Sequence, residues 1–270
     1  MKFDLTDTEP VPRKIQPIIF VVDVSGSMSG KKITRVNSAL RTTISRIEEA
    51  TARQARYEVA IAILRYSEIT DWAGGCQLIP VSKFIFQDLW AAGRSDLGIA
   101  LSALDKSLSS RCLFSSPVGY MPPTIVFIGY HGACGDWKTA LGKLSENEWF
   151  NVSSKIAIVL TEFGPWDAYS EAVRVGNASQ SFIAAVNPDE SLDEVIIRIL
   201  EYSAIRGVKK LERSGMDAPW MANSPLLWND PFLRNHIIVE QINDPIFIRD
   251  FNDKPHEQDI DTIGFDEKWE

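Results

Sequence analysis

Short apolar runs alternate with longer segments of helical period along most of the chain. Six runs have the length and the β-branched content that are typical of strands. They are residues 17–23, 57–64, 76–81, 124–130, 155–161 and 180–186. Three of these runs contain IIFVVD, TIVFIGY and KIAIVLT, which are apolar on both faces. That pattern indicates central strands of a parallel sheet that helices cover on both sides.

The segments between the strands carry apolar residues at helical spacing, each set on one face of a helix. The sets are Ile33, Val36, Leu40, Ile44 and Ile47; Leu97, Leu101, Leu104 and Leu108; and Leu192, Val195, Ile196, Ile199 and Leu200. The short segment DWAGG at 71–75 suits a hairpin, so we expect one antiparallel edge strand. The alternation predicts a three-layer, doubly wound α/β domain with a mostly parallel sheet over residues 17–206.

The chain changes character on either side of this domain. Residues 1–16 form a polar arm. Residues 207–270 are rich in turn residues and then contain HIIVEQI and PIFIRDF, which we interpret as short strands. Residues 250–270 carry eight acidic residues and two lysines, with apolar residues spaced among them. We predict an acidic C-terminal extension, partly extended or disordered, that is either solvated or a docking segment.

Composition and charge restrict the class of partner. The formal net charge of −8 disfavours a nucleic acid, which a basic face would have to hold. No apolar segment has the length of a signal-peptide core or a membrane span, so we expect a cytoplasmic protein without a membrane partner. The three cysteines, Cys76, Cys112 and Cys134, lack the spacing of a metal site, so we expect free thiols in a reducing compartment.

The turn after the first apolar run concentrates side chains that carry oxygen. Asp23 ends the run, and Ser25, Ser27 and Ser29 follow it. A phosphate loop would need four residues between its glycines and a Ser or Thr after its lysine, whereas GSMSGKK has three residues and a second lysine. A hydrolase nucleophile elbow would need glycines two positions before and after the serine, where Ser25 has Asp23 and Ser27. Both enzyme motifs are therefore poorly matched.

Helix capping and metal binding are the two remaining interpretations of this turn. A capping serine or aspartate satisfies free N–H groups at a helix start and contributes about 1 kcal/mol. One cap needs a single hydroxyl, however, and this turn offers three and a carboxylate. Mg²⁺ prefers oxygen ligands and is usually held by few protein groups. The turn also lies where ligands of open α/β sheets bind, at the carboxyl end of a strand.

Asp23-Val24-Ser25-Gly26-Ser27 resembles the Asp-x-Ser-x-Ser signature of von Willebrand factor type A (vWA) domains, whose metal-ion-dependent adhesion site binds Mg²⁺. The segment AAGRSDLGIAL at 91–101 resembles the loop that supplies a further ligand, with Ser95 where threonine is usual. The resemblance covers residues 17–206. It implies a metal site formed by Asp23, Ser25, Ser27 and Ser95, with Asp96 or Asp136 as acidic support.

The fourth element of the family's site departs from the pattern. Family members usually have Thr-Asp-Gly after a later strand, where this chain reads Tyr130-His131-Gly132. An imidazole there replaces a carboxylate, and Mg²⁺ prefers oxygen to nitrogen. We therefore expect a degenerate site that binds Mg²⁺ weakly, binds Mn²⁺ or Zn²⁺ instead, or stays empty.

Residues 119–137, GYMPPTIVFIGYHGACGDW, are similar to the TerY-like, tellurite-resistance-associated branch of this family. The resemblance implies a cytoplasmic, bacterial and non-enzymatic protein-protein interaction module of a stress-response or signalling system. It also implies a kinase or a PP2C-type phosphatase as partner. Two alternatives stay open: a metal-free scaffold that binds through the C-terminal extension, and a metal-assisted hydrolase that uses His131 as its base.

Overall fold

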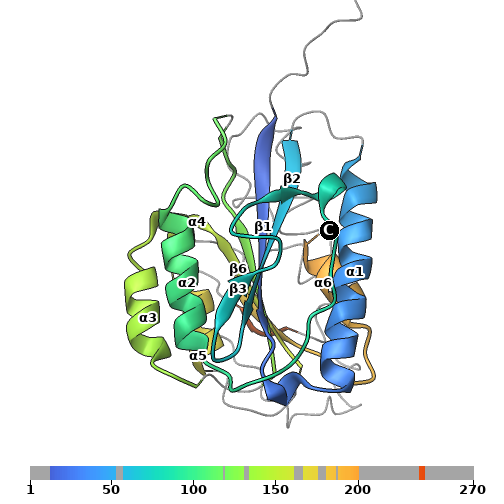
Figure 1. Ribbon diagram of the computed structural model, residues 1–270, viewed down its shortest axis with the longest axis vertical. Helices are drawn as coiled ribbons and strands as arrows, with labels where there is room; N and C mark the ends of the chain where they lie inside the picture. Colours follow the sequence, from blue (N-terminus) through green and yellow to red (C-terminus); the bar gives the residue numbers. More distant parts are fainter. Residues whose placement is uncertain are drawn as a thin grey trace, which may run out of the picture.

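Strands from across the chain form one mostly parallel sheet through the middle of the molecule (Figure 1). The computed structural model describes residues 13–52, 57–117, 119–130, 134–160, 167–175, 181–186, 188–200 and 237–240. In these residues the sheet has eight strands, which are β1 (Lys14–Asp23), β2 (Tyr57–Tyr66), β3 (Thr70–Trp72), β4 (Ile79–Pro80), β5 (Thr124–Gly129), β6 (Ser154–Val159), β7 (Phe182–Ala185) and β8 (Ile237–Glu240). Their order is β3-β2-β1-β5-β6-β7-β8, and β4 also pairs with β2.

The central strands are parallel and the outer strands are antiparallel to their neighbours. β2, β1, β5, β6 and β7 pair in parallel register. β3 and β4 run antiparallel to β2, and β8 runs antiparallel to β7. The carboxyl ends of the parallel strands meet at one edge of the sheet, where Asp23 of β1 stands in register with Tyr66 of β2. This edge is where ligands of such sheets bind.

Helices cover both faces of the sheet (Figure 1). On one face lie α1 (Lys31–Thr51) and α6 (Leu192–Leu200). On the other lie α2 (Leu97–Ser109), α3 (Trp137–Leu144), α4 (Glu148–Val152) and α5 (Asp167–Arg174). Two short 3₁₀ turns are η1 (Gly26–Met28) and η2 (Val81–Lys83). Of the helices in the described residues, none combines the length and the apolar character that a bilayer crossing requires.

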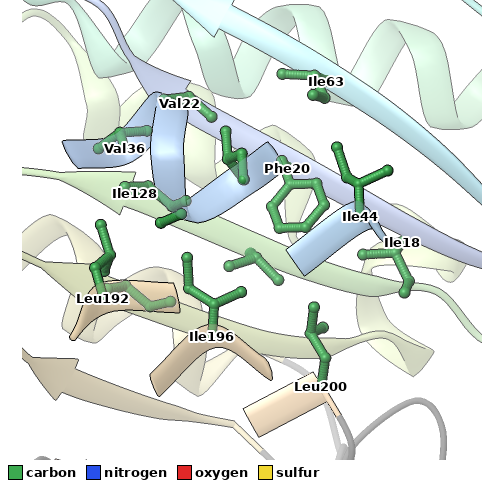
Figure 2. Close-up of a cluster of buried hydrophobic side chains, with 14 of the residues drawn as sticks. Ile18, Phe20, Val22, Val36, Ile44, Ile63, Ile128, Leu192, Ile196 and Leu200 are labelled. Carbon is green, nitrogen blue, oxygen red and sulfur yellow. The ribbon is translucent and has the colours of Figure 1, made fainter. Parts of the chain in front are cut away.

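Alternate side chains of β1 enter two separate cores. Phe20 and Val22 pack with side chains of α1 and α6 (Figure 2), whereas Ile19 and Val21 pack among the helices of the opposite face. All four are fully buried. Complete burial of such a side chain stabilises the fold by roughly 1.5–3 kcal/mol. Burial on both faces explains why the central strands are apolar at every position.

The three-layer, mostly parallel α/β architecture confirms the fold predicted from the sequence. The antiparallel edge differs in detail, because the run predicted as strand 76–81 contributes only the short β4, beside an additional β3. Gly74 and Gly75 have φ of 83° and 90°, which turns the chain between the two pieces. Pro80 lacks an N–H group and limits further pairing. β1 begins at Lys14, within the predicted N-terminal arm.

One run of the predicted extension joins the sheet. Within HIIVEQI, β8 pairs with β7, so the strand predicted there is confirmed. The second predicted run, PIFIRDF, lies outside the described residues, as does the acidic segment 250–270.

The expectation of three free thiols is wrong for two cysteines. Cys76, between β3 and β4, forms a disulfide with Cys112, which follows α2. Their Cα atoms are 5.6 Å apart, within the usual range for a disulfide. The two residues are separated by 36 positions, so only the tertiary fold brings them together. Cys134 is free and exposed.

Candidate metal site

The turn between β1 and η1 is organised around a buried carboxylate. Asp23 is 1% exposed at the carboxyl end of β1. Its Oδ1 accepts a hydrogen bond from the Ser25 N–H at 2.7 Å, which fixes the chain direction after the strand. The Ser25 and Ser27 hydroxyl oxygens are 2.9 Å apart. The structure therefore brings together the Asp-x-Ser-x-Ser side chains that the sequence singled out.

The loop that carries Ser95 lies against this turn. The Ser95 hydroxyl donates to Asp23 Oδ2 at 3.1 Å. The Gly26 N–H donates to the Gly93 carbonyl at 2.8 Å, and a Cβ atom on Gly26 would stand 3.2 Å from that carbonyl oxygen. A residue with a side chain at position 26 would crowd the contact that holds the two segments together. Asp23 and Ser95, which are 72 positions apart, thus share one site.

Two buried tyrosines lie beside the carboxylate, and the sequence reasoning missed both. Tyr66 ends β2, and its hydroxyl is 2.8 Å from the hydroxyl of Tyr169 on α5. Ser95 is a further hydrogen-bonding partner of Tyr66. The position of Tyr66 beside Asp23 could have been predicted, because each residue lies at the end of one of two neighbouring parallel strands. Tyr169 comes from a helix and has no such local signal.

Burial keeps both phenols protonated. The pKa of Tyr66 is raised well above its ordinary value by burial, then by Tyr169 and by the Asp23 carboxylate. Burial and Asp23 likewise raise the pKa of Tyr169. A Cβ atom on Gly129, at the end of β5, would lie 2.0 Å from the Tyr169 hydroxyl oxygen, so glycine makes room for the pair. The tyrosines add neutral hydroxyl groups to the oxygen-rich end of the sheet.

The charge of Asp23 has no basic side chain to balance it among the described residues. The ion pairs found in that part of the chain do not include Asp23; they are Arg41–Asp88, Arg65–Asp71 and Arg198–Glu194. An unpaired buried carboxylate is costly, and a bound cation would offset that cost. Carboxylate and hydroxyl oxygens are the ligands that hard divalent cations prefer. The donor set therefore fits a cation such as Mg²⁺.

The donor set is unusual in depending on hydroxyls. In the part of the chain that the structure describes, no three His, Cys, Asp or Glu side chains gather as a metal site. Asp96 and Asp136, the expected acidic supports, act as helix caps. Asp96 accepts from the Ile99 N–H at 3.2 Å, and Asp136 accepts from the Thr139 N–H at 3.3 Å. Asp96 thereby fixes the start of α2 directly after Ser95.

The fourth element of the expected site lies mostly outside the described residues. His131 and Gly132 are among the residues not described, so their contribution stays a prediction. Tyr130 is described, and the Lys32 ammonium group lies 3.9 Å from the centre of its ring. This contact joins the start of α1 to the end of the β5 segment.

The chain is similar to known proteins in structure and not in sequence. No protein family model matches the chain, and no curated protein sequence matches it. A von Willebrand factor type A protein from Catenulispora acidiphila matches with a TM-score of 0.52 and 14% identity, over 70% of this chain and 43% of that chain. VWA2, an ArnB paralog from Sulfolobus acidocaldarius, matches with a TM-score of 0.48 and 14% identity, over 69% of this chain and 45% of that one.

These similarities concern the fold. The matches span less than half of each of the two known chains. The chain has the vWA fold, as the Asp-x-Ser-x-Ser resemblance predicted. The assignment to the TerY-like branch stays a prediction.

Proposed function

Because the chain has the vWA fold, we propose that it is a non-enzymatic protein-interaction module that binds a divalent cation at the Asp23 turn. vWA domains commonly mediate protein-protein interactions. The observation that carries the proposal is the buried Asp23 carboxylate, which accepts hydrogen bonds from Ser25 and Ser95 beside the adjacent Ser25–Ser27 hydroxyl pair. Such a cluster offers oxygen ligands without a balancing positive side chain among the described residues.

In this proposal each residue has a defined part. The hydroxyl oxygens of Ser25, Ser27 and Ser95 are the direct ligands, and Asp23 supplies negative charge directly or through water. A bound cation would offer a coordination position to a carboxylate of the partner. Tyr66 and Tyr169 hold the hydroxyl of Ser95 and the end of β2 in place. We propose Mg²⁺ as the ion, with Mn²⁺ or Zn²⁺ favoured to the extent that His131 contributes nitrogen.

The finer proposal concerns the partner and the setting. The similarity of residues 119–137 to the TerY-like branch supports a bacterial, cytoplasmic stress-response or signalling system. A kinase or a PP2C-type phosphatase is then the proposed partner. The fold itself is compatible with many partners, so this part of the proposal rests on that segment alone.

Thermal unfolding in the presence and absence of cations tests the proposal. With about 10 mM Mg²⁺ and a dissociation constant of about 1 mM, binding to the folded state adds roughly 1.4 kcal/mol. We expect a rise of a few degrees in the midpoint for a chain of this size, and no rise in Asp23→Ala. An equal response of both proteins, or none with Mg²⁺, Mn²⁺ or Zn²⁺, would contradict the metal site and favour a metal-free scaffold.

A further inference from the structure

An extended segment runs antiparallel to α1, is fixed to the helix at two levels and is then fixed to the turn after β1. After η2, the Arg41 guanidinium lies 5.4 Å from the centre of the Phe86 ring. The Leu89 N–H donates to Asn37 Oδ1 at 2.8 Å, and Asn37 Nδ2 donates back to the Leu89 carbonyl at 3.0 Å. Further along, the Ala92 N–H donates to the Val24 carbonyl at 2.8 Å. Residues 84–92 are therefore a fixed wall beside the helix.

A groove of about 350 Å³ lies between this wall and α1. Its apolar surface comes mainly from Ile33 on the helix and Trp90 on the extended segment, while Leu89 lines the groove but is buried. Trp90 is 83% exposed, and Ile85 in the same segment is 85% exposed. Ile85 does not line the groove, so Trp90 is its large exposed apolar side chain, and an exposed tryptophan at the edge of a groove is typical of an interaction site.

The helix beside the groove is basic over most of its length. α1 carries Lys31, Lys32, Arg35, Arg41 and Arg46, and its acidic residues, Glu48 and Glu49, lie in its last turn. Lys31, Arg41 and Arg46 are exposed, as are Lys83 and Arg94 at the two ends of the extended segment, whereas Arg35 is half-buried and donates to the Glu190 carbonyl oxygen. Asp88, paired with Arg41, is the acidic residue that lines the groove. An occupant with negative charge and apolar anchors would match this surface.

We propose that residues 250–270 of the same chain occupy this groove, which we call the α1 groove. That segment has eight acidic residues against two lysines, a net charge of −6. Its apolar residues are spaced among the acids as anchors would be. They are Phe251, Ile260, Ile263, Phe265 and Trp269.

The chain is long enough for this arrangement. β8 ends at Glu240, and nine residues separate it from Asp250, enough to span about 30 Å when extended. In the sheet, β8 and β2 are five strand spacings apart. At 4.8 Å per spacing, the distance between these two strands is about 24 Å. None of the metal-site residues lines the groove, so the docking does not use the ligands of the proposed cation.

Zero-length cross-linking of the full chain tests the proposal. In metal-free buffer, a carbodiimide joins carboxylates to lysine amines that are in contact, and peptide mass spectrometry identifies the pairs. We expect the acids of residues 250–270 to be joined to Lys31, Lys32 or Lys83 within one molecule. Exposed lysines on the opposite face, namely Lys106, Lys138 and Lys143, are the internal reference. An equal mixture of ¹⁴N- and ¹⁵N-labelled protein distinguishes links within a chain from links between chains.

A matched pair of variants makes the test specific to the groove. Trp90→Ser removes the exposed tryptophan of the groove. We expect the yield of links to Lys31, Lys32 and Lys83 to fall about fivefold, as for an aromatic residue central to an interface. Val152→Ser, on α4 of the opposite face and 46% exposed, should leave the yield unchanged. Links spread evenly over both faces, or absent from Lys31, Lys32 and Lys83, would overturn the proposal. Mixed-isotope links would show a second copy as the occupant instead.

Discussion

Asp23 is the residue on which the two segments of the candidate site converge. One carboxylate oxygen accepts from the Ser25 N–H and the other from the Ser95 hydroxyl, while the side chain is almost fully buried. Without a cation, the buried negative charge is a cost to the folded state. With a cation, the same charge becomes a source of stability. The free energy of unfolding should therefore respond to metal through this single residue.

Substituting Asp23→Asn separates these two effects. The neutral amide oxygen can still accept from Ser25, but the buried charge is gone. We expect the variant to be as stable as the wild type or more stable in metal-free buffer, and to gain nothing from Mg²⁺. Denaturant unfolding with and without Mg²⁺ measures both quantities. A variant that is clearly destabilised without metal would show that the hydrogen bonds of the Asp23 carboxylate stabilise the turn by more than its buried charge costs, and a gain from Mg²⁺ would contradict its role at the metal site.

The hydroxyl pair of Tyr66 and Tyr169 should contribute to stability as a unit. Removing the Tyr66 hydroxyl leaves that of Tyr169 buried without this partner, at a cost of about 1–3 kcal/mol, whereas removing the Tyr169 hydroxyl leaves Tyr66 its contact with Ser95 and should cost less. Removing both should cost less than the sum. We expect a coupling free energy of about 0.5–1.5 kcal/mol from Tyr66→Phe, Tyr169→Phe and the double variant. Urea unfolding of the four proteins gives this value. Additive effects would show that the 2.8 Å contact does not stabilise the fold.

Lys155 makes the stability depend on pH. Its side chain is fully buried on β6, where Nζ donates to the Ser153 carbonyl at 2.8 Å. Burial lowers the pKa of Lys155 to about 7 from its ordinary 10.5. Between these two values the unfolded chain binds more protons than the folded one, so stability rises with pH by up to about 1.4 kcal/mol per unit. Below pH 7 both states are protonated and the full cost of the buried charge remains.

Lys155→Met should remove this dependence. We expect the variant to be more stable than the wild type at pH 7, with the difference shrinking as the pH approaches 10. Unfolding curves across that pH range measure the difference directly. Parallel pH profiles for the two proteins would contradict a depressed pKa for Lys155.

At the level of elements, the spacing of apolar residues predicts which segments are strands and which are helices. The apolar runs of β1, β5 and β6 and the faces of α1, α2 and α6 were readable because burial imposes a period on each element. The ends of the elements are harder to predict from the sequence. The strand predicted at 76–81 is reduced to β4, which ends at Pro80, and the sequence pattern did not predict β3, which follows Ser67–Ile69. The disulfide had no local signal at all, since it depends on how the β3–β4 connection lies against the end of α2.

Thiol titration tests that disulfide. In denaturant without reductant, we expect one reactive thiol per chain, from Cys134, and three after reduction. Loss of the disulfide in Cys76→Ser with Cys112→Ser should cost about 2–4 kcal/mol of stability. Protein purified under oxidising conditions is required for the comparison. Three reactive thiols in that unreduced sample would restore the expectation made from the sequence.

At the scale of the whole molecule, the fold accounts for where the candidate site lies. A parallel sheet brings the ends of β1 and β2 to one edge, and the loop before α2 brings Ser95 to the same edge. The family resemblance predicted Asp23, Ser25, Ser27 and Ser95 as a group, and the structure places them in two contacting pairs linked by the Asp23–Ser25 bond. Tyr169 was beyond prediction because its role depends on the packing of α5 over Gly129.

The most direct test of the account is a crystal structure of the full chain soaked with Mn²⁺, with the ion located by its anomalous scattering. The account predicts a peak within about 2.5 Å of the Ser25 and Ser27 hydroxyl oxygens, with Ser95 as a further ligand and Asp23 bound directly or through one water. A saturating soak that shows no peak at this turn, or places the ion elsewhere on the chain, would contradict the proposed metal site.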